Sequence, residues 1–250
     1  MLKLRRRRQV PRTPDARMSM LEHLGELRNR IFISLAAVLV GGIVAFFYSN
    51  EIIKFLVTYY QHAAKDDHAK LLNLSPVDGF VIRLKVATYG GIVLALPIWL
   101  YQLWRFVTPG MNAREKRYAI PFVASAIVLF LLGALVAFLT LEPALKFLIQ
   151  VGGSSQQASY TSEKYISLVS LMVVAFGISF EFPVVLVFLL IAKVLKVEQL
   201  QRARRWSIVG IFLFAAIITP SQDPYSLFFM AVPMCLFYEG SIIIGRILRR

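Results

Sequence analysis

Acidic side chains stand out in this sequence because of what surrounds them. Glu181 is the one charged residue in the stretch "AFGISFEFPVVLVFLL", from Ala175 to Leu190. At a helical rise of about 1.5 Å per residue, it would lie roughly 24 Å from Tyr165 and roughly 18 Å from Lys193. An ionised carboxylate at such a depth in hydrocarbon costs about 2.5 kcal/mol or more. We therefore expect Glu181 to be protonated or to face a water-filled concavity, and we treat it as a candidate functional residue.

Glu26 and Glu115 are acids of a different kind, since each lies among basic residues. Those neighbours are Arg28, Arg30, Arg114, Lys116 and Arg117. A carboxylate offers two oxygens that match the fork of a guanidinium group, so a pair of carboxylates suits a pair of arginines. The alternative is that both acids form local ion pairs with these same basic residues. The residues alone leave both interpretations open.

Groups that commonly carry catalysis are missing from the sequence pattern. The single cysteine, Cys235, falls within an apolar stretch, and the histidines His23, His62 and His68 have no metal-ligand spacing. The sequence has no glycine-rich phosphate loop, no nucleophile elbow and no paired intramembrane aspartates. We therefore expect neither an enzyme nor a bound metal or cofactor.

Apolar residues are gathered into blocks that predict an all-α integral membrane protein. Of the 250 residues, 58% are hydrophobic and 17% are charged, and the mean hydropathy is +0.65. The blocks are Ile31–Tyr48, Tyr89–Trp104, Tyr118–Leu141, Leu168–Ala192, Ile208–Ile218 and Tyr225–Gly245. About 20 apolar residues match a hydrocarbon layer of roughly 30 Å, so we predict six transmembrane helices. The fifth has at most about 13 apolar residues, roughly 20 Å of helix, and is short for a bilayer.

The charge of +14 is explained by membrane topology. Segments 1–30, 105–117, 193–205 and 246–250 hold 21 of the 28 Lys and Arg residues. An excess of basic residues marks cytoplasmic segments, so we predict that both termini are cytoplasmic. Segments 49–76, 142–164 and 219–224 are then outside. We see no nucleic-acid footprint in this pattern.

The chain divides into a basic extension and one membrane domain. Residues 1–20 are predicted to be a disordered basic segment, and residues 21–250 a single six-helix domain. A short helix is expected on the outer surface within 49–76, from its apolar spacing. Pro97 is expected to bend the second span, and Gly177 and Pro183 flank Glu181 in the fourth.

Four motifs occur in order along these spans. They are "HLGELRNR" (23–30), "WRFVTPGMNAREKR" (104–117), "FGISFEFPV" (176–184) and "TPSQDPYS" with "AVPM" (219–234). Together they resemble TatC, the polytopic subunit of the twin-arginine protein translocase, over roughly residues 18–245. The resemblance implies a cupped, glove-like bundle in the cytoplasmic membrane of a prokaryote. It also implies recognition of signal peptides that carry two consecutive arginines. With single-span partners of the TatA and TatB type, such a subunit moves folded proteins across the membrane using the proton motive force, and self-association is expected.

The resemblance assigns roles to particular residues. Glu26 and Glu115 would bind the arginines of the signal peptide, and Phe106 and Pro109 would shape the floor of the site. Leu24 and Arg28 complete this set of candidates.

For Glu181 three roles remain: a polar contact for a TatA or TatB helix, local thinning or wetting of the bilayer, or a hydrogen bond to a neighbouring helix. We favour the first two together.

The last two spans carry further candidates. Asp223 matches an aspartate of the family in the outer turn, where Pro220 and Pro224 make a purely turn-forming role nearly as good an explanation. The region where partner helices dock in the family maps to Thr219, Ala216 and Leu227. Two of these three are apolar here, which favours apolar packing at this place. Glu239 is interpreted as reaching toward arginines at the end of the chain, Arg246 and Arg249.

A proton- or cation-coupled transporter of small molecules, with Glu181 as the coupling carboxylate, is the alternative function. An internal repeat is typical of many such transporters, and the sequence shows none. The sequence also places no second acid near the same depth on another span of the outer half, and its fifth helix is very short.

Overall fold

The computed structural model describes residues 20–64, 71–107, 119–151 and 161–248. These residues form α-helices joined by turns, and their one β-contact is an isolated bridge between Leu72 and Thr161. The helices are α1 (Met20–Phe47), α2 (Ser49–Ala64), α3 (Asp78–Leu94), α4 (Leu96–Val107), α5 (Ala119–Val151), α6 (Ser162–Phe180), α7 (Phe182–Ile191), α8 (Val197–Ile218) and α9 (Pro224–Leu248). The predicted all-α class is confirmed.

Membrane-spanning helices are present in the described residues. Four stretches are long and apolar enough to cross a bilayer: His23–Phe47, Ile120–Val151, Ser162–Ile191 and Pro224–Ile247. The pair α3 and α4 makes a fifth if it crosses as one bent span. Helix α8 has 22 residues, but it begins with the polar sequence "VEQLQRARR", so its apolar part is short, as predicted. The chain is a multi-pass membrane protein, and the count of six spans stays a prediction.

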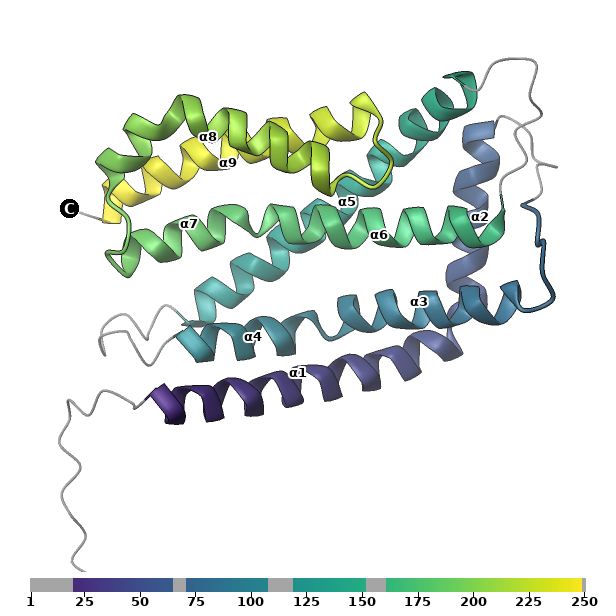
Figure 1. The fold of residues 1–250 in the computed structure, drawn as a ribbon, viewed down its shortest axis with the longest axis horizontal. Coiled ribbons are helices and arrows are strands. Elements are labelled where there is room, and N and C mark those ends of the chain that lie inside the picture. The colour runs from purple at the N-terminus through teal and green to yellow at the C-terminus, as the bar shows by residue number, and fades with distance from the viewer. Residues whose placement is uncertain (1–19, 65–70, 108–118, 152–160, 249–250) are drawn as a thin grey trace, which may run out of the picture.

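Figure 1 shows how the helices are arranged. Helix α1, the pair α3 and α4, the pair α6 and α7, and the hairpin of α8 and α9 run side by side, and α5 crosses them obliquely. Helix α2 lies across one end of this array, which agrees with the short outer helix that the sequence predicts. Helix α1 begins and α9 ends at the opposite end. The start of α1 and the end of α9 therefore lie on the same side, as the predicted topology requires.

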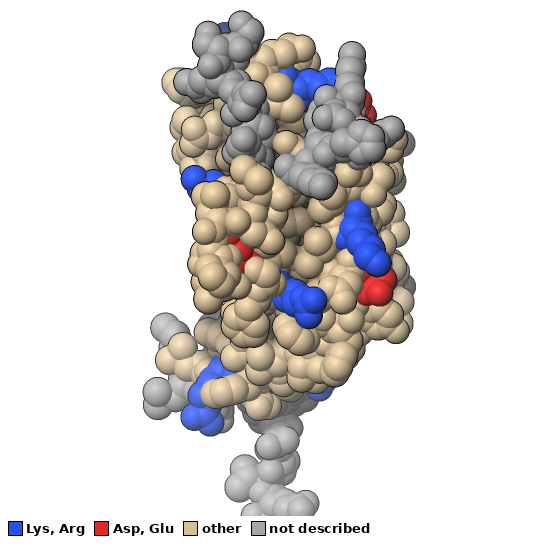
Figure 2. All heavy atoms as spheres, turned by 90° about the vertical axis from the view of Figure 1, so that its right-hand side faces the viewer, with Lys and Arg blue, Asp and Glu red and all other residues tan. Residues whose placement is uncertain are grey.

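The end that carries α2 is the outer end in that topology. Figure 2 looks onto it and shows that the Lys and Arg side chains of the described residues on this face are scattered among apolar and uncharged ones. The expected outer segments are partly helical, since α2 fills 49–64 and α5 continues as far as Val151. Lys85 of α3 pairs there with Glu163 and donates a hydrogen bond to Ser167 Oγ at 2.8 Å, which ties α3 to α6.

The second span breaks where the sequence predicts. Helices α3 and α4 meet at Ala95 with a bend of 53°, two residues before Pro97. Proline has no N–H and its ring crowds the preceding turn, so helical hydrogen bonds are lost at this point. The indole Nε1 of Trp99 donates to the carbonyl oxygen of Ile92 at 3.0 Å and satisfies one acceptor near the break. The bend directs α4 toward the start of α1.

Helix α1 is held against α3 by glycines on both helices. A Cβ atom added to Gly91 would lie 2.6 Å from the carbonyl oxygen of Val38, and one added to Gly41 would lie 2.9 Å from that of Gly91. The backbones therefore approach too closely for side chains, as at small-residue contacts in membranes. We call Gly41, Gly42, Gly90 and Gly91 the glycine seam. It determines where the first residues of α1 lie relative to α4.

The central helix is α6, which packs against α3, α5 and α9. Its large side chains, among them Ile166, Phe176 and Phe180, are almost fully buried. Gly177 faces Phe130 of α5 so closely that a Cβ would lie 2.5 Å from the ring. Such tight packing fixes the end of α6, where Glu181 is located.

Candidate functional site

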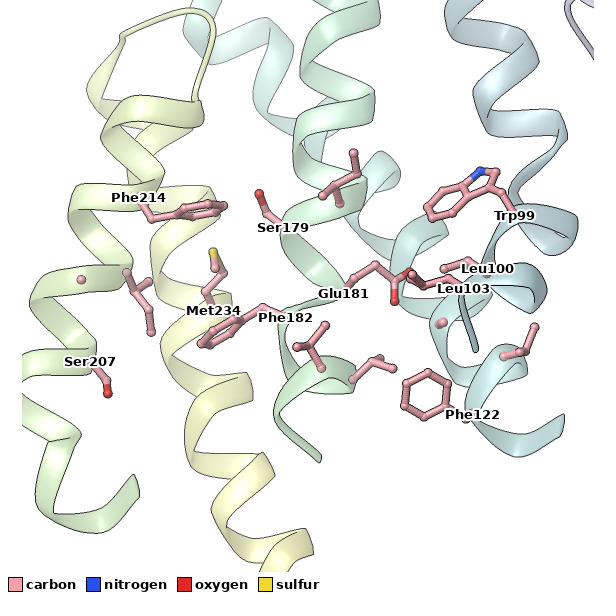
Figure 3. A pocket seen from close by; sticks show the side chains of 17 residues that line it. Trp99, Leu100, Leu103, Phe122, Ser179, Glu181, Phe182, Ser207, Phe214 and Met234 are labelled. Carbon is pink, nitrogen blue, oxygen red and sulfur yellow. The ribbon is translucent and has the colours of Figure 1, made fainter. Parts of the chain in front are cut away.

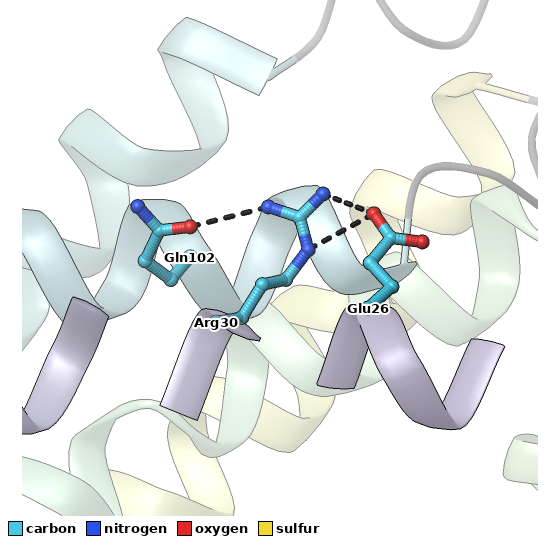
Figure 4. Close-up of polar contacts among 3 residues, drawn as sticks. All are labelled: Glu26, Arg30 and Gln102. Atoms are coloured by element: carbon cyan, nitrogen blue, oxygen red, sulfur yellow. Dashed lines mark hydrogen bonds and ion pairs between the residues drawn. The ribbon is translucent and has the colours of Figure 1, made fainter. Parts of the chain in front are cut away.

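The first candidate site is built around Glu26 at the start of α1. Arg30 lies one turn later on the same face, and its Nε donates to Glu26 Oε1 at 3.0 Å while Nη2 contacts the same oxygen. The remaining nitrogen, Nη1, donates to Oε1 of Gln102 on α4 at 3.1 Å (Figure 4). The local ion pair that the sequence offered as one alternative is thus present for Glu26.

That pair leaves half of the Glu26 carboxylate unused. Oε2 is buried and accepts no hydrogen bond within the part of the chain that the structure describes. The side chains of Glu26 and Arg30 are 19% and 13% exposed, so the pair is largely shielded from solvent. A buried acceptor without a donor costs about 1–3 kcal/mol. The Oε2 atom is therefore an acceptor that the described residues leave unused.

Aromatic stacking positions the same end of α1. The rings of His23 and Phe106 are stacked, with centroids 4.4 Å apart and planes at 14°. Phe106 therefore lies one turn of α1 from Glu26, and the role that the resemblance implies for it stays a prediction. His23 was not among the candidates, because the sequence gives no indication that it meets a residue of α4.

The other candidates at this end differ in accessibility. Leu24 is 60% exposed and Arg28 is exposed, so both present their side chains at the surface of α1. Pro109 and Glu115 lie outside the described residues, as does Arg114. A groove of about 440 Å³ lies between α1 and α4 beside the ion pair, lined mostly by apolar side chains such as Leu27, Ile31 and Leu103.

The second candidate site surrounds Glu181. It lies at the junction of α6 and α7, where Pro183 at the start of α7 lacks an N–H for the preceding turn. Its side chain points into a pocket of about 640 Å³ between α4, α5, α8 and its own helices (Figure 3). Helix α9 contributes Met234, and the other lining side chains are almost all apolar.

Glu181 is chemically isolated in this pocket. Its Oε1 is buried without a hydrogen-bond partner. The two hydroxyl groups of the lining are used elsewhere, since Ser179 donates to the carbonyl oxygen of Ala175 at 2.7 Å and Ser207 donates to the hydroxyl of Tyr238 at 2.9 Å. Among the described residues, the carboxylate makes no hydrogen bond to a neighbouring helix, so this geometry offers no support for a purely structural role.

The turn between α8 and α9 is closed by Asp223. Its Oδ1 accepts a hydrogen bond from the backbone N–H of Ser226 at 2.8 Å, which caps the start of α9. Asp223 is 1% exposed, and Pro220 lies in the same turn. The turn-forming role is therefore visible, although Asp223 Oδ2 is buried and without a partner in the described chain.

The residues expected at a partner-docking surface are divided by this turn. Thr219 is buried, and its hydroxyl lies 3.8 Å from the sulfur of Met230. Ala216 is exposed and Leu227 is half-buried. The surface offered by these positions is apolar, in agreement with the sequence.

Of the two arginines expected to partner Glu239, Arg246 is wrong and Arg249 lies outside the described residues. Glu239 Oε2 accepts a hydrogen bond from Arg204 Nη2 of α8 at 2.7 Å, and both side chains are 45% exposed. Arg246, which the sequence offered as a partner, lies instead beside Gln201. Helix α8 runs antiparallel to α9 in the hairpin, so its basic first turns reach Glu239, and distance along α9 alone does not reveal this.

The site residues that the structure describes include no group of three or more His, Cys, Asp and Glu side chains able to hold a metal ion. The two sites instead hold carboxylates in contrasting surroundings. One carboxylate is ion-paired and largely shielded at the end of the helix array, and the other is a polar group in an apolar pocket.

Comparison with known proteins places these features in a family. Residues 22–233 match the family model "Sec-independent protein translocase protein (TatC)". A protein of that name from Aquifex aeolicus is 41% identical over 93% of this chain and 97% of its own length. Another, from Frankia casuarinae, is 38% identical over 92% of this chain, which spans 66% of that relative's length. The chain also resembles the solved structure titled "Crystal Structure of Twin Arginine Translocase Receptor- TatC", with a TM-score of 0.76, 40% identity and coverage of 91% of this chain and 100% of that chain.

The family match covers the first turns of α1, the break between α3 and α4, Glu181 and the turn at Asp223. The resemblance that the four motifs suggest is thereby confirmed. The chain belongs to the TatC family of Sec-independent protein translocase proteins.

Proposed function

We propose that this chain is the signal-recognising subunit of a twin-arginine translocase, which exports folded proteins using the proton motive force. The observation that carries the proposal is the Glu26 carboxylate at the start of α1, with Oε2 buried and unpaired among the described residues. A guanidinium group is the side chain best matched to such an acceptor, because it presents N–H donors in a planar fork. The similarity to a solved twin-arginine translocase receptor supports the same role.

Recognition would use the cytoplasmic end of the molecule. Glu26 would accept one arginine of the signal peptide, and Glu115, in the segment that follows α4, would accept the other. Leu24 and Arg28 are exposed on α1 close to Glu26 and would contact the flanking residues of the peptide. Phe106, and with it Pro109, would form the floor.

The pocket of Glu181 would serve the later step. TatA- and TatB-type single-span proteins are the partners we propose. An apolar pocket with one polar group suits a transmembrane helix that carries a polar side chain, because a hydrogen bond in hydrocarbon contributes about 0.6–1.7 kcal/mol. Glu181 would also draw water or head groups into the array. The membrane would be the cytoplasmic membrane of a prokaryote, and we propose no enzymatic activity.

A coupled transporter of small molecules finds less support. Glu181 is the one ionisable residue among those that line its pocket, and a coupled transporter commonly pairs such an acid with a second polar ion site. The pocket lining around Glu181 supplies no such site.

Photo-crosslinking tests the proposed function. A photoreactive residue replaces Leu24, and in a second variant Met111, in membranes that contain the partner proteins. Signal peptides with Arg-Arg or Lys-Lys are then supplied. We expect adducts with Arg-Arg alone, and their loss in Glu26→Ala and Glu115→Ala.

The same probe at Leu39 is the matched control. Leu39 is on α1 and 62% exposed, but it lies more than three turns from Glu26. Adducts at Leu39 equal to those at Leu24 would indicate non-specific contact. Absence of adducts at Leu24 and Met111 with both peptides would contradict the proposal.

A further inference from the structure

Arg30 presents to Glu26 the same chemical group that a signal peptide would present. Its Nε and Nη2 both contact Oε1 of the carboxylate, and the partly buried pair is charge-neutral as a unit. An incoming arginine therefore meets a receptor that already holds a guanidinium group. Figure 4 shows this arrangement with Oε2 directed away from Arg30.

We propose that Arg30 is a resident competitor for Glu26 and that it determines the preference of the site for arginine over lysine. The proposal rests on the proposed function, in which Glu26 receives an arginine of the signal peptide. It adds a specificity-determining residue that does not itself contact the bound peptide.

The geometry explains why a competitor would select for arginine. A bidentate guanidinium contact needs both oxygens of the carboxylate, so an incoming arginine gains its second hydrogen bond when Arg30 gives up Oε1. A lysine ammonium is a point donor that would use Oε2 alone and would face the charge of Arg30 close by. A guanidinium group thus regains by its second hydrogen bond what the displacement of Arg30 costs, whereas an ammonium group regains much less.

Gln102 makes the displacement feasible. A largely buried guanidinium group released without an acceptor would be costly, since loss of one partner leaves a shielded charge unpaired. Arg30 Nη1 already donates to Gln102 Oε1 at 3.1 Å, and this contact can persist when the other two are lost. Gln102 comes from α4, so the bend at Pro97 also positions the acceptor that holds Arg30.

The opposite role makes an opposite prediction. If Arg30 served to orient Glu26 for the peptide, its removal would weaken binding of every signal peptide. If Arg30 competes, its removal strengthens binding, and more so for the peptide with lysines.

The test is binding of fluorescent signal peptides to the full chain in lipid nanodiscs, with Arg-Arg and Lys-Lys versions of one sequence. For Arg30→Gln we expect the Lys-Lys peptide to bind about tenfold more tightly and the Arg-Arg peptide about threefold, because a charge-assisted contact no longer has to be broken. The Arg-over-Lys ratio therefore falls about threefold. Arg30→Lys keeps the positive charge but lacks the guanidinium fork. Its Arg-over-Lys ratio should therefore lie between that of the unmodified protein and that of Arg30→Gln.

Gln102→Glu gives Arg30 a carboxylate of its own on α4. The Arg-over-Lys ratio should fall here too, with Arg30 still in place. A general attraction of the added negative charge would tighten both peptides equally and leave the ratio unchanged, which would contradict the proposal.

Arg204→Gln is the matched control. Arg204 also pairs with a glutamate, Glu239, and its loss removes the same charge from the chain. Both affinities should stay as in the unmodified protein. If Arg204→Gln and Arg30→Gln raised the peptide affinities equally, the effect would come from net charge alone, and the proposal that Arg30 competes would be wrong.

Glu26→Gln in the same assay separates the two proposals. If it leaves binding of the Arg-Arg peptide unchanged, the proposed function fails at this residue. If it weakens binding while Arg30→Gln also weakens binding, Glu26 is the receptor and only the competitor is wrong. The thermal unfolding temperature of each variant is compared with that of Arg30→Lys, and a marked decrease identifies a variant that has lost its fold.

Discussion

Glu26 and Glu181 are the same residue type in opposite situations. Glu26 shares one oxygen with Arg30 at the end of the helix array, and the other oxygen is unpaired. Glu181 lies in an apolar pocket, and none of the residues that line it is basic. In our proposal the first acid receives a cation by exchanging its ion pair with Arg30. The second is a polar group in apolar surroundings. Replacement of each glutamate by glutamine, which removes the charge and keeps the polarity, should therefore affect the two sites differently.

The two regions also differ in how they are supported. The Glu26 end depends on α1, which is joined to the rest of the molecule through the glycine seam and the stack of His23 on Phe106. The Glu181 pocket depends on the tightly packed α6 and its neighbours. Among the described residues that line that pocket, none belongs to α1. Damage confined to α1 should therefore leave the Glu181 pocket intact, whereas α4 is shared, since its Trp99 and Leu103 line both the pocket and the groove beside Glu26.

The largest expected effect comes from breaking the seam with Gly91→Val. The added side chain would meet the backbone of α1 at Val38 and Gly42, which must shift. Overpacking of this kind costs about 1–3 kcal/mol. We expect binding of an Arg-Arg peptide to fall about tenfold or more, measured by fluorescence, because α1 no longer meets α4 correctly.

Gly79→Val is the control for the seam, since a Cβ at Gly79 meets no atom within 4 Å. It makes the same Gly-to-Val exchange in the first turn of α3 without a clash. If Gly79→Val weakened peptide binding as much as Gly91→Val, close packing at the seam would not be the cause.

The next effect separates polarity from charge at Glu181. Glu181→Gln should export cargo within about twofold of the unmodified chain, whereas Glu181→Leu should lose about three- to tenfold, in line with one interhelical polar contact. Export is measured as the amount of folded reporter protein that crosses the membrane. Signal-peptide binding should be unchanged in both variants.

Stability provides an independent check on Glu181. Replacing an unpartnered buried acceptor with an apolar side chain is neutral or stabilising, so Glu181→Leu should not lower the unfolding temperature. A loss of export in Glu181→Gln equal to that in Glu181→Leu would show that the negative charge is required.

The smallest effect is expected for the pair of Arg204 and Glu239. Both side chains are 45% exposed, and such pairs contribute about 0–1 kcal/mol. Glu239→Gln should change the unfolding temperature little and leave export as it was. A marked loss of export would mean that this embedded acid has a role comparable to that of Glu181.

Much of the fold could be predicted from the sequence, because a bilayer restricts the chain to helices of a certain length. Apolar blocks gave the long helices, Pro97 gave the break before α4, and the polar start of α8 explained its short apolar part. Glu181 could be identified from local sequence, since an acid within an apolar block is unusual wherever the helix packs.

Contacts between helices could not be predicted in the same way. Gln102 lies 72 residues from Arg30, and the stack of His23 on Phe106 also joins α1 to α4. Helical periodicity shows which face of a helix is apolar, but it does not show which other helix that face meets. The mistaken partner of Glu239 has the same origin: the sequence favoured nearby arginines, and the hairpin brought Arg204 instead.

The seam has a consequence for how the first helix tolerates change. Many of its apolar side chains, such as Phe32, Leu39 and Ile43, are more than half exposed and have no shape to match. Natural variation should therefore exchange one apolar residue for another along most of α1. The positions that resist should be few: the glycines that face α3, and the polar turn that contains Glu26 and Arg30. Although most of α1 resembles a generic membrane anchor, two places would thus restrict its sequence. The glycines fix its position against α3, and the turn with Glu26 and Arg30 provides its ligand contacts.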